Sequence, residues 1–161
     1  MELADISRRT GLSTRQLRYV VDHGVLPGFR ATGAMGPGRG SPRHFTEFEA
    51  FCIATAGLLL VAGIRRRTVA QLIERACEER RGFKSKTPSA PLLDAFCSKK
   101  PLTLEIGDGV NYRLRNPLST ALDKDAPPWF QASTGAALAA DYRPLVHLII
   151  DAGRVRDTLM A

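Results

Sequence analysis

The chain has 161 residues, of which 44% are hydrophobic, and its formal net charge is +7. The length allows one or two small domains, and the apolar fraction is enough for a hydrophobic core. The positive charge favours an anionic partner, nucleic acid ahead of a membrane surface. Residues 50–64 form the one long apolar run, which is shorter than the roughly 20 residues that cross a bilayer, so we expect no membrane partner.

The charge is concentrated in the first half of the chain. Residues 1–83 contain 13 Arg, no Lys and 8 acidic residues, a net charge of +5. Arginine suits bidentate recognition of phosphate and guanine. A GC-rich genome, which favours arginine codons, produces the same bias, so both explanations stay open at this point.

The sequence shows no signal peptide at Met1, and its cysteines are odd in number without CxxC spacing. We therefore expect Cys52, Cys77 and Cys97 to be small core residues of a protein in the reducing cytoplasm.

Two short helices are expected at residues 3–10 and 13–23, separated by a tight turn. Gly11 can end the first helix in the left-handed conformation. Ser13 and Gln16 form the pattern of a capping box at the start of the second. In the second helix the 3-4-7 spacing places one set of residues inward: Leu17, Val20, Val21 and Gly24.

The opposite face of the second helix carries Arg15, Arg18, Tyr19 and Asp22, with Thr14 in the exposed first turn. Guanidinium and phenol groups beside a helix N-terminus suit phosphate oxygens and base edges. For an isolated helix, the simpler interpretation is a solvated charged face. The segments that follow favour the nucleic-acid interpretation.

Residues 28–45 form a glycine-rich stretch that is expected to be a long loop between short strand segments near Phe29 and at residues 43–45. Its charged side chains are Arg30, Arg39 and Arg43, all positive. A basic loop beside two such helices resembles a DNA-binding wing, which contacts an adjacent phosphate or the minor groove. The alternative is an ordinary surface loop.

Two longer helices are expected next. One covers residues 47–62 after a Thr46/Glu49 capping box, and it is apolar on all sides, so it must be covered on more than one face. The other runs from residue 65 to about 81 and opens with three arginines. Positive charge is locally unfavourable at a helix N-terminus, so a bound phosphate or plain solvent exposure must offset it.

Residues 82–100 are expected to be a linker, since they contain Gly82, Pro88 and Pro91. Beyond them, alternating residues flank Asp108-Gly109, a strong signal for a β-hairpin. Residues 145–150 indicate a buried strand that contains His147, expected to be a satisfied structural histidine, and residues 153–160 indicate a terminal helix. At roughly 60 residues this unit is marginal for folding alone.

The ordered motifs of residues 3–74 resemble the DNA-binding domain of MerR-type bacterial regulators. They are LADISRRTG, LSTRQLRYVVDHGVLP, PRHFTEFEA and LLVAGIRRRTVAQLI. The resemblance implies that Thr14 and Arg15 approach bases. It also implies that Arg18 and Tyr19 bind phosphates and that Arg39 and Arg43 act from the wing. The chain departs from the family in two respects: Val20 stands where a second Tyr is usual, and the long coiled-coil dimerisation helix is absent.

We therefore expect an α+β protein. Residues 1–81 would form a winged helix-turn-helix domain of four helices and a two-strand wing. Residues 82–100 would be the linker, and residues 101–161 a small unit of hairpin, strand and helix. The expected function is sequence-specific binding of double-stranded DNA in transcription regulation, in the cytoplasm at the nucleoid.

Two alternatives remain open: an excisionase-like or architectural recombination factor, and a protein-interaction module that binds RNA polymerase or another partner. A homodimer is possible through the third helix or the C-terminal unit. No catalytic, cofactor or metal-binding pattern is found, so an enzyme is not expected.

Overall fold

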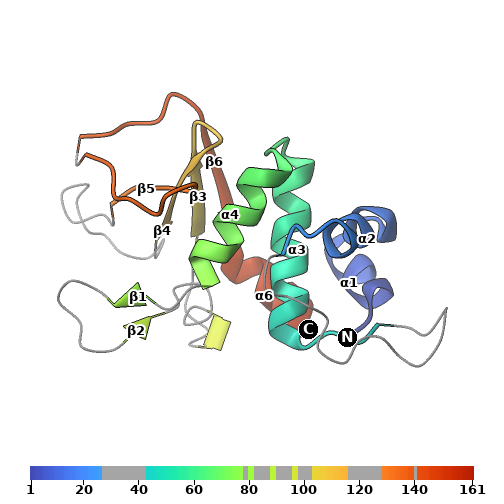
Figure 1. The fold of residues 1–161 in the computed structure, drawn as a ribbon. Coiled ribbons are helices and arrows are strands. Elements are labelled where there is room, and N and C mark those ends of the chain that lie inside the picture. The colour runs from blue at the N-terminus through green and yellow to red at the C-terminus, as the bar shows by residue number, and fades with distance from the viewer. Residues whose placement is uncertain are drawn as a thin grey trace. The chain divides into compact units, whose positions relative to one another are not determined.

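The computed structural model describes residues 1–26, 43–77, 80–81, 88–89, 96–97, 103–115, 128–139 and 141–161. Their contacts divide the chain into two compact units, one of residues 1–73 with 155–161 and one of residues 74–154. The described residues combine helices with an antiparallel sheet (Figure 1), so the fold class is α+β, as predicted.

The helices begin at residues that can cap them. α1 covers Leu3–Thr10, α2 covers Thr14–Asp22, and α3 covers Glu47–Val61. The predicted capping boxes of α2 and α3 are confirmed, because Ser13 pairs with Gln16 and Thr46 with Glu49. Each box satisfies backbone N–H groups that the first helical turn leaves unpaired. Gly11 ends α1 at a φ of 74°, the left-handed conformation expected for it.

The core of the first unit forms around α3, whose residues 50–57 and Leu59 are all buried. α1 contributes Ile6 to this core, and α2 contributes Leu17 and Val20. Burial of one such side chain stabilises the fold by about 1.5–3 kcal/mol. Gly24, expected to face inward, is instead exposed with a φ of 62°, because the chain turns there immediately after α2.

α4 covers Arg66–Cys77, and α6 covers Ala152–Met160. The predicted extension of α4 to residue 81 is wrong, because Arg80–Arg81 forms strand β1 and pairs antiparallel with β2, Pro88–Ser89. Val155 and Leu159 of α6 are buried, as expected for the terminal helix. In the first unit, Arg9 of α1 donates a hydrogen bond to the carbonyl of Leu159.

The strand expected at residues 43–45 is not present. Phe45 donates its N–H to the Met1 carbonyl and accepts from the Met1 amine, both at 2.8 Å. The chain terminus therefore occupies both backbone groups that a wing strand would need at Phe45. Residues 27–42, the rest of the predicted wing, lie outside the described residues.

Cysteine placement also differs from expectation. Cys52 is buried as predicted, but Cys97 is exposed. Residue type alone, with no periodic pattern around it, does not determine whether a side chain is buried.

The second unit contains a four-stranded antiparallel sheet in the order β5-β4-β3-β6 (Figure 1). Its strands are β3 Thr103–Gly107, β4 Asn111–Arg115, β5 Phe130–Gln131 and β6 His147–Asp151. Asp108 and Gly109 have φ values of 52° and 70°, and with Val110 they form the turn of the predicted hairpin, since Gly107 pairs with Asn111.

β6 is an edge strand rather than the buried strand expected at residues 145–150. Leu145 is 97% exposed and Ile149 is 55% exposed. An apolar run indicates burial only if both faces of its strand are covered, and here Ile150 on one face is buried whereas Leu145 and Ile149 on the other are exposed.

The packing around residue 107 leaves no room for a side chain, so the position requires glycine. A Cβ there would lie 2.9 Å from Pro144 Cβ, 3.0 Å from Trp129 Cζ3 and 3.1 Å from Tyr142 Oη. We predict that Gly107→Ala lowers the free energy of unfolding by about 1–3 kcal/mol, because Pro144 and the two aromatic rings must shift. Urea denaturation of the full chain measures this, and exposed Ser133→Ala is the control. A Gly107→Ala variant as stable as the parent would contradict the close packing.

Candidate nucleic-acid interface

α2 presents a polar ridge on the side opposite to its buried residues. The ridge consists of Thr14, Arg15, Arg18 and Tyr19; the last three are exposed, and Thr14 is partly exposed. Leu17 and Val20 are fully buried on the other side. The helix is therefore held by its apolar face, and the orientation of the ridge follows from that packing. These four residues are brought together as the sequence predicted.

Tyr19 is held in place by a residue that the sequence analysis did not select. The rings of Tyr19 and His23 stack with centroids 4.3 Å apart and planes 20° apart. His23 Nδ1 also lies 3.2 Å from the Tyr19 carbonyl oxygen. The stack limits the rotamers of Tyr19, which is 40% exposed, and keeps its hydroxyl on the ridge. The i, i+4 spacing of the two aromatic residues is the signal in the sequence.

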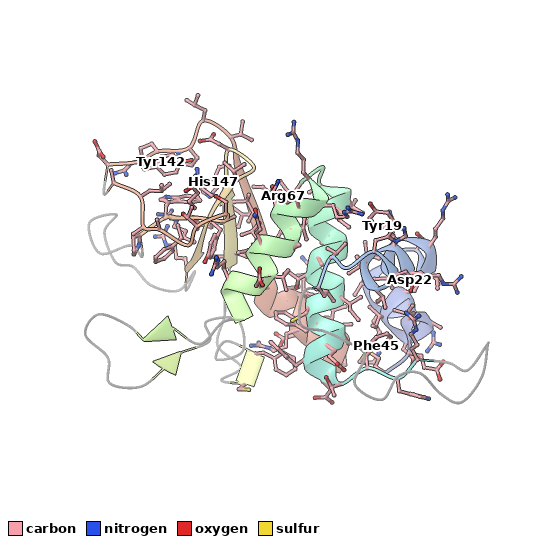
Figure 2. The ribbon with its side chains drawn as sticks, in the orientation of Figure 1. Tyr19, Asp22, Phe45, Arg67, Tyr142 and His147 are labelled. Carbon is pink, nitrogen blue, oxygen red and sulfur yellow. The ribbon has the colours of Figure 1, made fainter. Side chains whose placement is uncertain are left out.

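Arg43 lies beside the end of α2. Its Nη1 is 2.7 Å from Asp22 Oδ1, and both side chains are about 40% exposed, at 40% and 37%. Asp22 therefore neutralises the charge of Arg43, and its carboxylate lies next to the ridge (Figure 2). Arg39, the other predicted wing contact, lies outside the described residues.

Several exposed arginines of the first unit form neither an ion pair nor a side-chain hydrogen bond with any described residue, unlike Arg9, which bonds to the Leu159 carbonyl. They are Arg15, Arg18, Arg65, Arg66 and Arg67. Arg8 by contrast pairs with Asp5 at 3.4 Å. An exposed guanidinium without an acidic neighbour retains its full attraction for an anion, so these five are the groups best suited to bind phosphate.

A groove runs beside the ridge, between α2 and α3. Its volume is about 420 Å³, and its lining combines the apolar groups of α3 with polar groups of α2: Gly57, Leu60 and Val61, and Arg15, Gln16 and Tyr19. The sequence analysis missed it because α3 was expected only to be covered on more than one face, which does not show where it stays uncovered. Val61 is in fact 56% exposed.

The sheet of the second unit carries a polar cluster that sequence reasoning also missed. Buried Glu105 of β3 accepts from Arg113 Nε at 2.5 Å, and His147 Nε2 lies 3.2 Å from the same oxygen. Trp129 covers the cluster, with Arg113 4.6 Å from its ring centroid. Register explains the grouping, since Glu105 lies opposite Arg113 on β4. The charges of Glu105 and Arg113 are paired with one another within the sheet.

Asp108 joins the hairpin turn to the segment before β6. Its carboxylate accepts from Tyr142 Oη at 2.5 Å and from the N–H groups of Leu145 and Val146 at 2.9 and 3.0 Å. These bonds, led by the one from Tyr142, lower the pKa of Asp108. Burial and the bond to Asp108 raise the pKa of Tyr142, which lies near His147 in Figure 2.

In the part of the chain that the structure describes, no group of three or more His, Cys, Asp and Glu side chains is placed to hold a metal ion. No helix formed by those residues has the length and apolar character needed to span a bilayer. Comparisons with protein-family models, curated proteins and solved structures find no match to this chain.

Asp22 gives a test of the electrostatics of the ridge. We predict that Asp22→Asn raises affinity for double-stranded DNA at low salt, because it removes a negative charge and releases Arg43 to bind phosphate. The free energy of unfolding should change by less than about 1 kcal/mol, since exposed ion pairs contribute little. Fluorescence anisotropy with labelled duplex measures the first effect and urea denaturation the second. Unchanged DNA binding would show that Asp22 lies away from the interface, and weaker binding would contradict its proposed electrostatic effect.

The lowered pKa of Asp108 predicts the acid response of the second unit. The stabilisation from the charged carboxylate is fully present when the pH is above the pKa of Asp in the unfolded chain, roughly 3.9. This stabilisation is lost as the pH falls through the lower pKa that Asp108 has in the folded protein. Asp108→Asn should therefore flatten the pH dependence of unfolding below pH 4. Denaturation at several pH values tests this, with exposed Asp141→Asn as the control. Equal slopes in Asp108→Asn and the parent would contradict it.

Proposed function

We propose that this chain binds double-stranded DNA sequence-specifically and regulates transcription, with α2 inserted in the major groove. The observation that carries the proposal is the α2 ridge, where two unpaired arginines and an oriented tyrosine share one exposed helix face. The major groove admits an α-helix. On this proposal Thr14 and Arg15 contact bases, whereas Arg18 and Tyr19 contact phosphates, and the protein acts at the nucleoid.

The remaining arginines support the same partner. Arg65, Arg66 and Arg67 are exposed at the start of α4, where the helix dipole disfavours positive charge. A phosphate bound there would offset that cost. Arg43, and Arg39 from the predicted wing, would approach the flanking backbone, and Asp22 would tune the contribution of Arg43.

The resemblance of residues 3–74 to MerR-type DNA-binding domains adds a second, separate line of support. It rests on the order of the motifs, from LADISRRTG to the arginine-rich start of α4. The resemblance implies a winged helix-turn-helix with DNA as its ligand. An excisionase-like architectural factor would use the same surface, and strong bending of DNA at phased sites would favour that role over control of a promoter.

The groove between α2 and α3 favours one other candidate, a protein-interaction module that binds a component of the transcription machinery. Its floor is apolar and its rim carries Arg15, so a partner helix with an acidic residue would fit. The groove shares Arg15 and Tyr19 with the ridge. Loss of DNA binding in the ridge variants below therefore distinguishes the two functions.

The base-contact and phosphate-contact roles separate in mutants. Arg15→Ala should reduce discrimination between the preferred site and random DNA by about 1–3 kcal/mol. Arg18→Ala should weaken binding to both DNAs and reduce the slope of log affinity against log salt by about one. Selection from a random duplex library identifies the preferred site, and anisotropy titrations at several salt concentrations give both quantities.

Arg154→Ala is the matched control, since Arg154 is an exposed arginine of the other compact unit. Arg154→Ala should leave the discrimination between the two DNAs unchanged. It should alter the salt dependence of affinity only by the small effect of removing one positive charge from the protein. Parent-like affinity and discrimination in both ridge variants would disprove the proposed roles.

A further inference from the structure

The outer edge of β6 carries backbone groups that the described part of the chain leaves unpaired. Asp108 N–H donates to the Val146 carbonyl at 2.9 Å. Hydrogen-bonded residues alternate along an antiparallel ladder, so residues 146, 148 and 150 direct their backbone groups to β3. His147, Ile149 and the N–H of Asp151 direct their backbone groups away from the sheet, and no described residue bonds to them there. The Asp151 carbonyl is excepted, since it lies at the start of α6.

The side chains along this edge are apolar and exposed. Leu145, Val146 and Ile149 are 97%, 66% and 55% exposed. Proteins commonly protect such edges with Lys, Pro or a bulge. Residues 147–151 contain neither Lys nor Pro, and their register with β3 is continuous. The edge is therefore suited to pair with another strand.

The residues of β6 match those of a second β6 in antiparallel orientation. If Ile149 lies opposite Ile149 of the second copy, His147 lies opposite Asp151 at both ends. In its imidazolium form His147 donates to Glu105 through Nε2–H and keeps Nδ1–H as a donor for the second carboxylate. Asp151 caps α6 through Oδ1, 2.8 Å from Arg154 N, which leaves Oδ2. The same surface therefore supplies both halves of a charge-complementary contact, as a twofold interface requires.

We propose that β6 pairs antiparallel with β6 of a second copy of this chain, around a twofold axis beside Ile149. The two Ile149 residues exchange their backbone hydrogen bonds, and each Asp151 N–H donates to the opposite His147 carbonyl. The Asp151 carbonyl already accepts the first bond of α6. Two four-stranded sheets thereby join into one. This self-association is independent of DNA binding and goes beyond the proposed function.

A contact of two five-residue strands is smaller than the roughly 1,200 Å² that stable interfaces bury, so the dimer should be reversible. Sedimentation equilibrium of the full chain without DNA should show a monomer–dimer equilibrium. Ile149→Lys should raise its dissociation constant by about tenfold or more, because two ammonium groups then lie opposite one another.

Val110→Lys is the matched control. Val110 is 49% exposed at the β3–β4 turn, so the same change from apolar to charged should leave the equilibrium unaltered. A parent chain that stays monomeric up to about 1 mM, or an Ile149→Lys variant that dimerises like the parent, overturns the proposal.

Crosslinking tests the register separately from stability. Opposite residues of a hydrogen-bonded antiparallel pair have Cα atoms about 5.5 Å apart, within disulfide range. Ile149→Cys should therefore form a disulfide-linked dimer in oxidised glutathione, with a 149–149 crosslink in the peptide map, whereas Val110→Cys should not. Equal crosslinking of both variants, or no 149–149 peptide, overturns the proposed pairing.

Discussion

Burial of α3 on nearly all sides is the constraint on which the first unit depends. α1 and α2 each contribute large apolar side chains to it, among them Ile6 and Leu17. The turn between α1 and α2 packs so closely on α3 that a Cβ at Gly57 would lie 2.9 Å from Leu12 Cδ1, and 3.6 Å from Leu17 Cδ2 of α2. The direction of the α2 ridge is a consequence of that contact. Polar residues on the ridge contribute little to stability, so their chemistry can vary while the apolar face keeps its direction.

Local signals in the sequence predicted the elements well where one residue type has one physical role. The capping boxes at Ser13 and Thr46 and the turn at Asp108-Gly109 all appear where expected. Helical spacing also predicted which face of α2 is exposed. The prediction was wrong where the outcome depends on distant partners. Phe45 bonds to Met1 rather than to a wing strand, and nothing near residue 45 in the sequence indicates this.

The candidate sites divide in the same way. The ridge lies on one helix, so periodicity alone was enough to group its residues. The polar cluster of the sheet was not predictable, since Glu105, Arg113 and His147 come from three strands and meet only through their register. His147 was correctly expected to have a structural partner, but no local pattern identified Glu105 as that partner. The exposed side of β6 was missed because an apolar run does not reveal whether its strand lies at an edge.

The buried charges of the sheet have a consequence for its register. A slip of one residue between strands moves every side chain to the opposite face. Here it would move Glu105 to the face of the sheet where the neighbouring strands place the buried side chains of Tyr112 and Ile150, away from Arg113. Separating a buried pair in this way costs about 3–5 kcal/mol. Replacing the pair by apolar residues would remove that penalty and make the slipped registers competitive. The cluster therefore contributes specificity more than stability, and the same register positions the Asp108 turn against the segment that leads into β6.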